Sequence, residues 1–286
     1  MLSASKNGLV NQANHSSRTK VVAQAFDLLA AAHDAFVFKT NDLYTMRINE
    51  LLCTHLAEVS PGAFILDMGG GSGQWSLTLS RAGYKVCLAD ISLRMLSHAQ
   101  ARLPINEKID LVCADARMPP FHLEAFQAVL LIGDVLSYLD DPIKALRAMV
   151  SISKPGTLFI GTVISQVGFA IRLLRAGNIA DARSLLLSGY AVERTKSDLV
   201  YLAIREGLPE PVLPLTFCSY TTQQLHRLLI SSGLRPITLE GINILKTMGF
   251  PKAVTVSHLG LNCEQRIGAY WPWFDISTNL FFVAIV

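Results

Sequence analysis

The sequence is poor in charge. Only 16% of its 286 residues are charged, whereas 51% are hydrophobic, which excludes a disordered chain and predicts a large buried core. The formal net charge is only +3. Because Lys and Arg do not cluster with aromatic residues as they would along a phosphate backbone, we expect no nucleic-acid partner.

The sequence also lacks the patterns of a disulfide framework or a metal site. Its five cysteines are odd in number and scattered, with no C-x-x-C spacing, and its seven histidines form no pair at metal-ligand spacing. Residues 1–17 do not have the layout of a signal peptide, and no uncharged apolar run reaches membrane length. We therefore expect a soluble cytoplasmic protein that holds no metal and does not bind a membrane.

Two common nucleotide-binding fingerprints are missing. G-x-G-x-x-G would need glycine at Gln74 or Ser76, and no Lys-Ser or Lys-Thr follows the glycines. The motif that is present is Asp67-x-Gly69-x-Gly71-x-Gly73, directly after an apolar strand. Glycines at this spacing let a bulky cofactor lie against the main chain, and a carboxylate beside them suits a cationic amino-acid group.

A second apolar strand, 85–90, ends in Asp90 at about the distance at which a ribose-binding acid follows a glycine loop. The two oxygens of this carboxylate can accept both hydroxyls of a ribose. With the motifs Asp67-x-Gly-x-Gly-x-Gly, Asp90-Ile-Ser-x-x-Met-Leu-x-x-Ala, Cys113-Ala-Asp-Ala and Lys154-Pro-Gly, the sequence resembles the class I S-adenosylmethionine-dependent methyltransferases. The resemblance covers about residues 64–161 and 216–240.

The resemblance implies S-adenosylmethionine as the cofactor and gives matching residues a role. Asp67 and the glycines would hold the methionine and ribose side, Asp90 the ribose, and Asp115 the adenine amino group, while Ala116 would offer a backbone donor to the ring. Thr157 departs from the family pattern, which usually has a second glycine there. The cofactor-binding set in this part of the chain is Asp67, Gly69, Gly71, Gly73, Asp90, Ile91, Asp115, Ala116 and Gly133.

Apolar strands alternate with helices from residue 63, which predicts a parallel sheet covered on both faces. The expected fold is an α/β, Rossmann-like, doubly wound sheet of seven strands with an antiparallel last strand. We expect a flexible terminus at 1–17, a helical cap at 18–60, the cofactor-binding core at 61–165, a lid insertion at 166–215, and completion of the sheet with an aromatic segment at 216–286.

The helical cap offers two polar side chains. Tyr44 and Arg47 lie one turn apart on the second predicted helix, 40–59, so both can face the same place, and Arg47 could clamp the cofactor carboxylate. Either residue could instead lie half-exposed on an amphipathic helix.

The predicted strand 126–132 is followed by Gly133, Asp134, Ser137 and Tyr138, which would border the reacting centre at the carboxyl edge of the sheet. Asp134 and Tyr138 are the catalytic candidates. Asp134 could be a base, a partner of the cofactor amine, or a helix cap. The Asn/Asp-Pro-Pro-aromatic signature of enzymes that methylate planar amides and bases is absent.

Three functions remain open. The first is methyl transfer to a small-molecule nucleophile, such as a specialised metabolite. The second, by resemblance to azetidine-2-carboxylate synthases, is cyclisation of the cofactor with release of methylthioadenosine, in which the aromatic segment 270–274 would close the site. The third is a non-catalytic regulator that binds the cofactor. The aromatic segment could equally pack the lid against the sheet.

Overall fold

The computed structural model of the chain describes residues 10–11, 17–39, 42–104, 106–193, 215–250, 257–270 and 272–286. Most of the terminus expected to be flexible, the proline-rich end of the expected lid at 208–214, and residue 271 of the aromatic segment lie outside these described residues. Among the described residues, no helix combines the length and the apolar character needed to cross a membrane.

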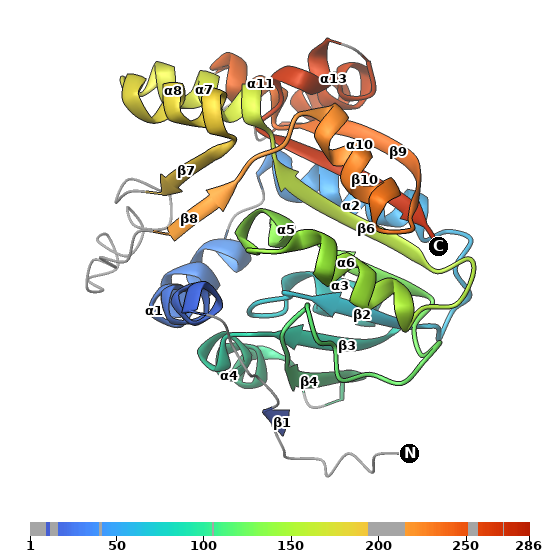
Figure 1. Cartoon of the computed structure of the whole chain (residues 1–286). Helices are drawn as coiled ribbons and strands as arrows, with labels where there is room; N and C mark the ends of the chain where they lie inside the picture. The colour runs from blue at the N-terminus through green and yellow to red at the C-terminus, as the bar shows by residue number, and fades with distance from the viewer. Residues whose placement is uncertain are drawn as a thin grey trace.

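A single large sheet forms the centre of the molecule (Figure 1). Its strand order is β1-β4-β3-β2-β5-β6-β10-β9, and β10 runs antiparallel to both of its neighbours. The predicted seven-stranded sheet with an antiparallel last strand is confirmed, and β1 adds a short eighth strand beside β4. The strands are β1 Val10–Asn11, β2 Phe64–Met68, β3 Lys85–Asp90, β4 Ile109–Cys113, β5 Ala128–Leu131, β6 Leu158–Ile164, β9 Arg235–Ile242 and β10 Asn279–Ile285.

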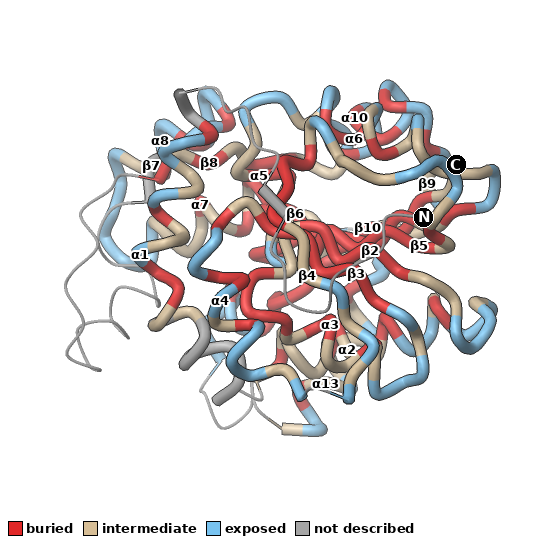
Figure 2. Tube along the Cα trace, turned by 90° about the horizontal axis from the view of Figure 1, so that it is seen from below, coloured by how far each residue is buried: buried red, intermediate tan, exposed pale blue. Residues whose placement is uncertain are grey.

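Helices cover both faces of the sheet. Its central strands carry apolar side chains on both sides, and both sets of side chains are buried under these helices. In Figure 2 the buried residues concentrate along the strands, and the exposed ones lie on the outer sides of the helices. One core cluster joins the sheet to α6 and α10, and another joins its opposite face to α2 and α3. These helices are α2 Leu43–His55, α3 Gln74–Arg81, α6 Pro142–Ser151 and α10 Thr222–Ser231; α4 Leu93–Arg102 packs beside β3 and β4.

Sequence signals at helix starts correspond to real caps. The Asp141 carboxylate accepts the Lys144 N–H at 2.9 Å, with Pro142 at the first helical position. Thr221 and Gln224 form both halves of a capping box at the start of α10. These local bonds fix where the two helices begin.

The described residues between β6 and α10, 166–193 and 215–218, form a small layer at one end of the sheet (Figure 1). Two helices pack on a two-stranded sheet, with the Phe169 and Phe217 rings 5.0 Å apart at the centre. The elements are α7 Gln166–Arg175, α8 Ile179–Ser188, β7 Tyr190–Glu193 and β8 Leu215–Cys218.

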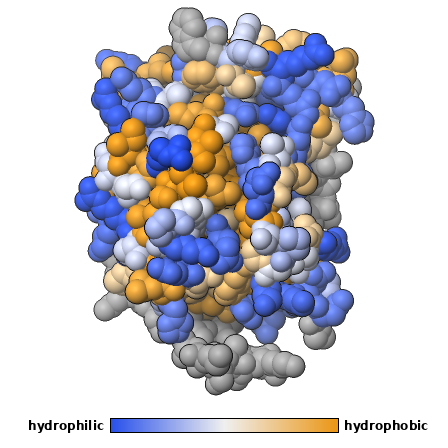
Figure 3. Space-filling view, turned by 90° about the vertical axis from the view of Figure 1, so that its right-hand side faces the viewer, coloured by the Kyte–Doolittle hydropathy of each residue, from blue (hydrophilic) through white to orange (hydrophobic). Residues whose placement is uncertain are grey.

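The remaining elements are α1 Ser17–Lys39, α5 Val135–Tyr138, α11 Ile244–Met248, α13 His258–Gly268 and the 3-10 turn η1 Trp273–Ile276. The helical cap expected at 18–60 includes α1, whereas α5 and α11 are not predicted, because they are too short to show a helical period. Figure 3 shows one side of the surface, where hydrophobic side chains gather between hydrophilic ones.

Candidate functional site

A cavity of about 290 Å³ opens where β2, β3 and β5 end. Carboxyl ends of parallel strands meet at one edge of a sheet, so loops that are far apart in sequence contribute to a single wall. Ten of the thirteen predicted site residues line this cavity: Tyr44, Gly69, Gly71, Asp90, Ile91, Asp115, Ala116, Gly133, Asp134 and Tyr138. The other three, Arg47, Asp67 and Gly73, do not line it.

The glycine loop forms one wall by the close approach of its main chain. Gly69 and Gly71 have φ values of 76° and 57°, in the left-handed region that glycine adopts without strain. A Cβ on Gly69 would lie 2.6 Å from a Val135 methyl carbon. The loop can therefore lie against α5 and the cavity only because it has no side chains at these positions.

Asp67 lies beneath the glycine loop. Its Oδ2 accepts the Ser76 hydroxyl at 2.6 Å and would be 2.7 Å from a Cβ on Gly70, while its Oδ1 is buried and has no partner among the described residues. Burial raises the pKa of Asp67 to about 6. The Asp67 carboxylate thus packs under the glycine loop on the side away from the cavity. Gly73 ends the loop as the N-cap residue of α3, in a left-handed conformation.

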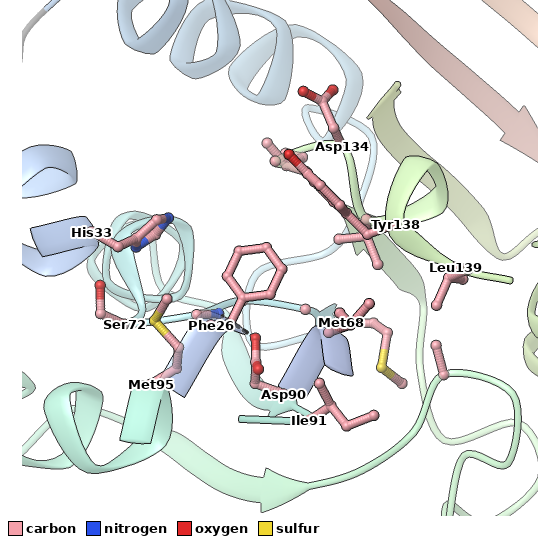
Figure 4. A pocket seen from close by; sticks show the side chains of 18 of the residues that line it. Phe26, His33, Met68, Ser72, Asp90, Ile91, Met95, Asp134, Tyr138 and Leu139 are labelled. Atoms are coloured by element: carbon pink, nitrogen blue, oxygen red, sulfur yellow. Dashed lines mark hydrogen bonds between the residues drawn. The ribbon is translucent and has the colours of Figure 1, made fainter. Parts of the chain in front are cut away.

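Asp90 holds the loop from the next strand. Its Oδ2 accepts the Gly71 N–H at 2.9 Å (dashed line in Figure 4), and its Oδ1 accepts the Ser92 N–H at 2.8 Å. Two carboxylate oxygens together have four lone pairs, so the carboxylate can accept a ligand hydroxyl in addition to these backbone N–H groups. Burial raises the pKa of Asp90 to about 6, although the backbone N–H groups of Ser92, Gly71 and Ile91 act in the opposite direction.

Asp115 is held by an arginine that the sequence reading missed. The Arg117 guanidinium contacts both oxygens of Asp115, at 2.6 Å for Nη2 to Oδ2 and 3.1 Å for Nε to Oδ1, and its Nη1 is 2.7 Å from Asp140 Oδ1. Bidentate pairs of this kind fix orientation. Asp115 lines the cavity with its charge already balanced, and any adenine amino group would share this carboxylate with Arg117.

A hydroxyl network joins α2, β5 and β6. Thr162 Oγ1 accepts the N–H groups of Gly133 and Asp134 at 3.1 and 3.0 Å, and lies 3.3 Å from the Tyr44 hydroxyl. A hydroxyl oxygen has two lone pairs and one proton, so with both lone pairs used we infer that Thr162 donates to Tyr44. Burial, with the charge of Asp134, raises the pKa of Tyr44, which keeps the phenol protonated.

Asp134 adopts a left-handed backbone at φ 62°, unusual for a residue with a side chain. It stands at the cap position of α5 but makes no side-chain capping bond. Instead, its Oδ2 accepts the Asn279 amide at 2.7 Å, and Asn279 Oδ1 accepts the Asn243 amide at 3.1 Å. A side-chain cap is therefore wrong, and a chain of two amides, Asn279 of β10 and Asn243 just before α11, holds the carboxylate.

Helix α1 closes the cavity opposite the glycine loop. Its residues Thr19, Val22, Phe26 and His33 line the cavity, and the Phe26 ring meets the Tyr138 ring edge to face at 5.4 Å. In Figure 4, Phe26 lies between Asp90 at one end of the cavity and Asp134 at the other. The sequence predicted a leading helix but could not say which of its residues face the cavity.

The carboxylate of Asp27 joins α1 to the start of α4. Its Oδ1 accepts the Ser92 hydroxyl at 2.5 Å and the Arg94 N–H at 3.1 Å at the start of α4. Acidic groups are stabilised at helix N-termini, because the backbone N–H groups there have no partner inside the helix. This contact sets the position of α1 over Asp90.

Arg47 does not reach the cavity. It is 7% exposed and forms ion pairs with Glu50 at 2.6 Å and with Glu240 of β9 at 2.5 Å. Tyr44 and Arg47 are one turn apart on α2, but their side chains do not point in the same direction. Tyr44 faces the end of β5, while Arg47 faces two carboxylates farther along the sheet, so the predicted clamp on a cofactor carboxylate is not supported.

The described residues of the aromatic segment, 270 and 272–274, do not line the cavity either. Tyr270 is 66% exposed and Trp273 39%, and the turn η1 contacts α7 and β9. The fit is close, since a Cβ on Gly168 of α7 would lie 1.7 Å from the Ser277 carbonyl oxygen. This favours the interpretation that the described part of the segment packs α7, on which α8 packs, against the sheet.

Known proteins resemble this chain in the region of the cavity. A family model described as a methyltransferase domain matches residues 65–156. A demethylmenaquinone methyltransferase of Renibacterium salmoninarum is 34% identical over 56% of the chain and 65% of its own length. The ubiquinone/menaquinone biosynthesis C-methyltransferase UbiE of Hahella chejuensis is 31% identical over 64% of the chain and 74% of its own length.

The match to the Renibacterium protein spans slightly less than two thirds of that relative. Among solved structures, the 1,6-didemethyltoxoflavin-N1-methyltransferase of Burkholderia thailandensis, with bound 1,6-didemethyltoxoflavin and S-adenosylhomocysteine, superposes with a TM-score of 0.55. It is 13% identical, and the superposition covers 97% of this chain and 93% of that one. At this identity the likeness concerns the fold.

Proposed function

We propose that this chain, which belongs to the class I S-adenosylmethionine-dependent methyltransferases, transfers a methyl group to a small organic acceptor held beside Asp134 and Tyr138. The chain is a transferase, and its cofactor is S-adenosylmethionine. The acceptor, the roles of individual residues and the absence of a nucleic-acid or membrane partner are parts of the proposal.

The residues around the cavity fit this cofactor. A loop without side chains at Gly69 and Gly71 lines the wall, the Asp90 carboxylate can accept further hydrogen bonds, and the buried Asp67 Oδ1, which has no partner among the described residues, lies behind the loop. Asp90 would hold the ribose hydroxyls, the glycine loop the methionine part, and Ile91, Asp115 and Ala116 the adenine. When bound, the cofactor supplies a methyl group already activated by its positive sulfur.

One observation carries the proposal: Asp90 and Asp134 lie at opposite ends of a single cavity, with the apolar Phe26 between them (Figure 4). If Asp90 holds the ribose, the reacting end lies towards Asp134. Displacement on an activated methyl group chiefly needs the nucleophile held in line and sheltered from water. Phe26, Val135 and Leu139 provide that shelter.

The chain's own groups at the reacting end have distinct tasks. Asp134, held by Asn279, would accept the proton of an acceptor that arrives protonated. Tyr44 stays a neutral phenol and offers its proton as a hydrogen bond, because Thr162 satisfies its oxygen. Tyr138 forms the wall against which the acceptor would pack. In this proposal Asp134 is the base and Tyr44 the hydrogen-bond donor, and both line the same apolar cavity.

The expected acceptor is a small, mostly apolar molecule, such as a specialised metabolite. The names of the relatives support this class, since they refer to demethylmenaquinone and to ubiquinone and menaquinone biosynthesis, and the superposed enzyme holds 1,6-didemethyltoxoflavin. The apolar lining from α1 and α5 also suits an acceptor of this kind.

The test uses the whole chain and S-adenosylmethionine carrying a labelled methyl group. Incubation with pools of small phenols, quinols and heterocycles is expected to give labelled products together with S-adenosylhomocysteine. Methylthioadenosine released from the cofactor alone would show cyclisation and overturn the proposal. Tight binding of S-adenosylhomocysteine with no product from any pool would favour the non-catalytic regulator.

A further inference from the structure

Two residues that are joined through Asn279 share an unusual backbone conformation. Among the described residues, those that combine a side chain with a positive φ are Glu124, Asp134 and Asn243. Asp134 and Asn243 each stand at the cap position before a short helix, α5 or α11, and neither makes a side-chain capping bond. Asp and Asn at such positions commonly bond to their own helix. Here both side chains bond to Asn279 of β10 instead.

Asn279 has a fixed place between these two residues. It is 8% exposed, and its strand is paired on both edges, with Ile164 of β6 and Ile242 of β9 opposite it. Its Nδ2 donates to Asp134 Oδ2 at 2.7 Å, and its Oδ1 accepts the Asn243 Nδ2 at 3.1 Å. Because ladders on both edges hold the backbone of this strand, the Asn279 amide has little freedom to move away from Asp134.

The direction of these hydrogen bonds follows from the carboxylate. An ionised carboxylate accepts hydrogen bonds and cannot donate them, so Asn279 must present its NH2 group to Asp134. The Asn279 carbonyl oxygen is then left for Asn243, which must present its own NH2 group. A proton on Asp134 Oδ2 would meet the N–H of Asn279. The two amides therefore suit an ionised Asp134, because a hydrogen bond donated to a charged group favours the charged form.

We propose that Asn279 and Asn243 are positioning residues for methyl transfer, which keep Asp134 ionised and held in place to take the proton of the acceptor. In that step the bond between the nucleophilic atom of the acceptor and its hydrogen breaks, and the proton moves to the Asp134 carboxylate. The electron pair of the nucleophilic atom forms the bond to the methyl carbon, while the bond from that carbon to sulfur breaks. Neither amide acts on the acceptor directly. This inference rests on the proposed function and deepens it.

Other titratable groups also face Asp134 from the surrounding elements. Tyr44 of α2 stays protonated, since burial and the charge of Asp134 raise its pKa, and Tyr138 follows on α5. The rest line the two cavities that Asp134 borders: His33, Asp90 and Asp115 in the main cavity, and Arg172 and Lys246 in a smaller one of about 130 Å³. Substitutions at positions 243 and 279 leave all of these groups in place, so a difference between such variants reports on the amides.

The first test measures the ionisation of Asp134 in the full chain saturated with S-adenosylhomocysteine. The readout is the C=O stretching band of the protonated carboxyl, followed between pH 4 and pH 8 by infrared difference spectroscopy against the same protein carrying D134N. Asn279→Leu keeps the approximate volume and removes the donor. The pH midpoint of the band is expected to rise by about one pH unit or more, because the charged form loses a hydrogen bond. An unchanged midpoint in folded N279L would overturn the proposal.

Asn243 offers a matched pair of variants at one position, because Asp and Gly both adopt a left-handed backbone. N243D places an acceptor where Asn279 now receives a donor, so the Asn279 amide should turn over and point its carbonyl oxygen at Asp134. N243G removes the donor without this reversal. We expect the midpoint to rise by about one pH unit in N243D and by clearly less in N243G. Equal midpoints in N243D and N243G would overturn the proposal.

Thr157→Val is the control for a general loss of stability. It removes a buried hydrogen bond from the Thr157 hydroxyl to the Phe126 carbonyl oxygen, at the other end of β6. T157V should lower the melting temperature and leave the midpoint of Asp134 where it is in the wild type. A midpoint that moved as far in T157V as in N279L would reflect destabilisation alone and would overturn the proposal.

The pH dependence of transfer separates this inference from the proposed function. In the labelled-methyl assay, the acid limb of the pH–rate profile should move upwards in N279L and N243D, together with the infrared midpoint. If the wild-type chain gives no methylated product from any pool, the proposed function fails, and the positioning role in transfer falls with it. If the wild type transfers methyl groups and both variants keep its acid limb, the function stands and the positioning role is wrong.

Discussion

The two ends of the main cavity are built in different ways. At the Asp90 end, consecutive residues after β2 and β3 present backbone N–H groups and carboxylates, so a few short loops complete the binding surface. At the Asp134 end, Tyr44 and Asp134 line the cavity and are held by Thr162 of β6 and Asn279 of β10, through bonds that span more than a hundred residues. The first end depends on backbone shape, and the second on tertiary packing.

This difference predicts that the ends can be disabled separately. Groups at the Asp90 end should set the affinity for the cofactor, and groups at the Asp134 end should set the rate of transfer once the cofactor is bound. Variants that change only the affinity or only the rate of transfer would support this division between the two ends. Variants that change both equally would contradict it.

The largest effect is expected at the reacting end. Asp134→Asn keeps the shape but removes the proton acceptor, and general-base catalysis contributes about 10²- to 10⁴-fold. We therefore expect single-turnover transfer to an acceptor with an ionisable proton to slow by about 100- to 1000-fold, with the affinity for S-adenosylhomocysteine changed less than about threefold. Asp110→Asn, exposed on β4, is the matched control. Unchanged transfer in D134N would remove Asp134 from the catalytic set.

The next largest effect is expected at the other end. Asp90→Asn leaves one acceptor oxygen where two now serve Gly71, Ser92 and the proposed ribose hydroxyls. Hydrogen bonds to charged groups contribute about 1.5–3 kcal/mol each, so the affinity for S-adenosylhomocysteine should fall by about 10- to 100-fold in calorimetry. Transfer at saturating cofactor should stay near the wild-type rate. A loss of rate without a loss of affinity would contradict the assignment, and a thermal melt checks the fold.

The same difference explains what the sequence could predict. The order of strands and helices from Phe64 to Ile164 follows from local periodicity and from caps such as Asp141, and the glycine loop with Asp90 is a contiguous signal. Asn279 has no such signal. It reaches Asp134 only because β10 pairs beside β6, a contact across 145 positions in the chain.

Arg47 shows the converse error. Its spacing from Tyr44 suggested a common target, but the partner that it binds, Glu240, lies on a strand far along the chain. A charged residue that becomes buried needs an opposite charge, and the sheet supplies one there. Helical spacing says which residues are neighbours on a helix but not which partner each of them meets.

A smaller effect is expected from alanine substitutions at two glycines that have similar backbone conformations. Gly71 and Gly156 have φ values of 57° and 89°, and a Cβ on either would meet no atom closer than 3.4 Å. Substitution by alanine should cost each about 1–2 kcal/mol of stability, because an L-residue is strained in this region. Only Gly71→Ala puts a methyl group into the cofactor wall.

We therefore expect similar falls in the melting temperature for Gly71→Ala and Gly156→Ala, together with about a tenfold loss of affinity for S-adenosylhomocysteine in Gly71→Ala alone. Calorimetry and thermal unfolding on the two variants measure both quantities. If the affinity fell equally in both, the loss would reflect destabilisation and not contact with the cofactor, and the glycine loop would lose its special role.

The smallest effect is a dependence on pH with opposite signs in two measurements. Burial raises the pKa of Asp90 to about 6, above the value of 3.8 for a free Asp side chain. Because the folded state holds this proton more tightly than the unfolded state, the contribution of Asp90 to stability rises as the pH falls from above 6 towards 4. A protonated carboxyl accepts hydrogen bonds less well, so the affinity for S-adenosylhomocysteine should fall over the same range, by at most about tenfold per pH unit.

Calorimetry and thermal unfolding between pH 5 and pH 8, on the wild type and on D90N, isolate the contribution of Asp90 to binding and to stability. If acidification strengthened both stability and binding in the wild type but not in D90N, Asp90 would bind the ligand in its protonated form, and the proposed ribose contact would need a donor in place of an acceptor.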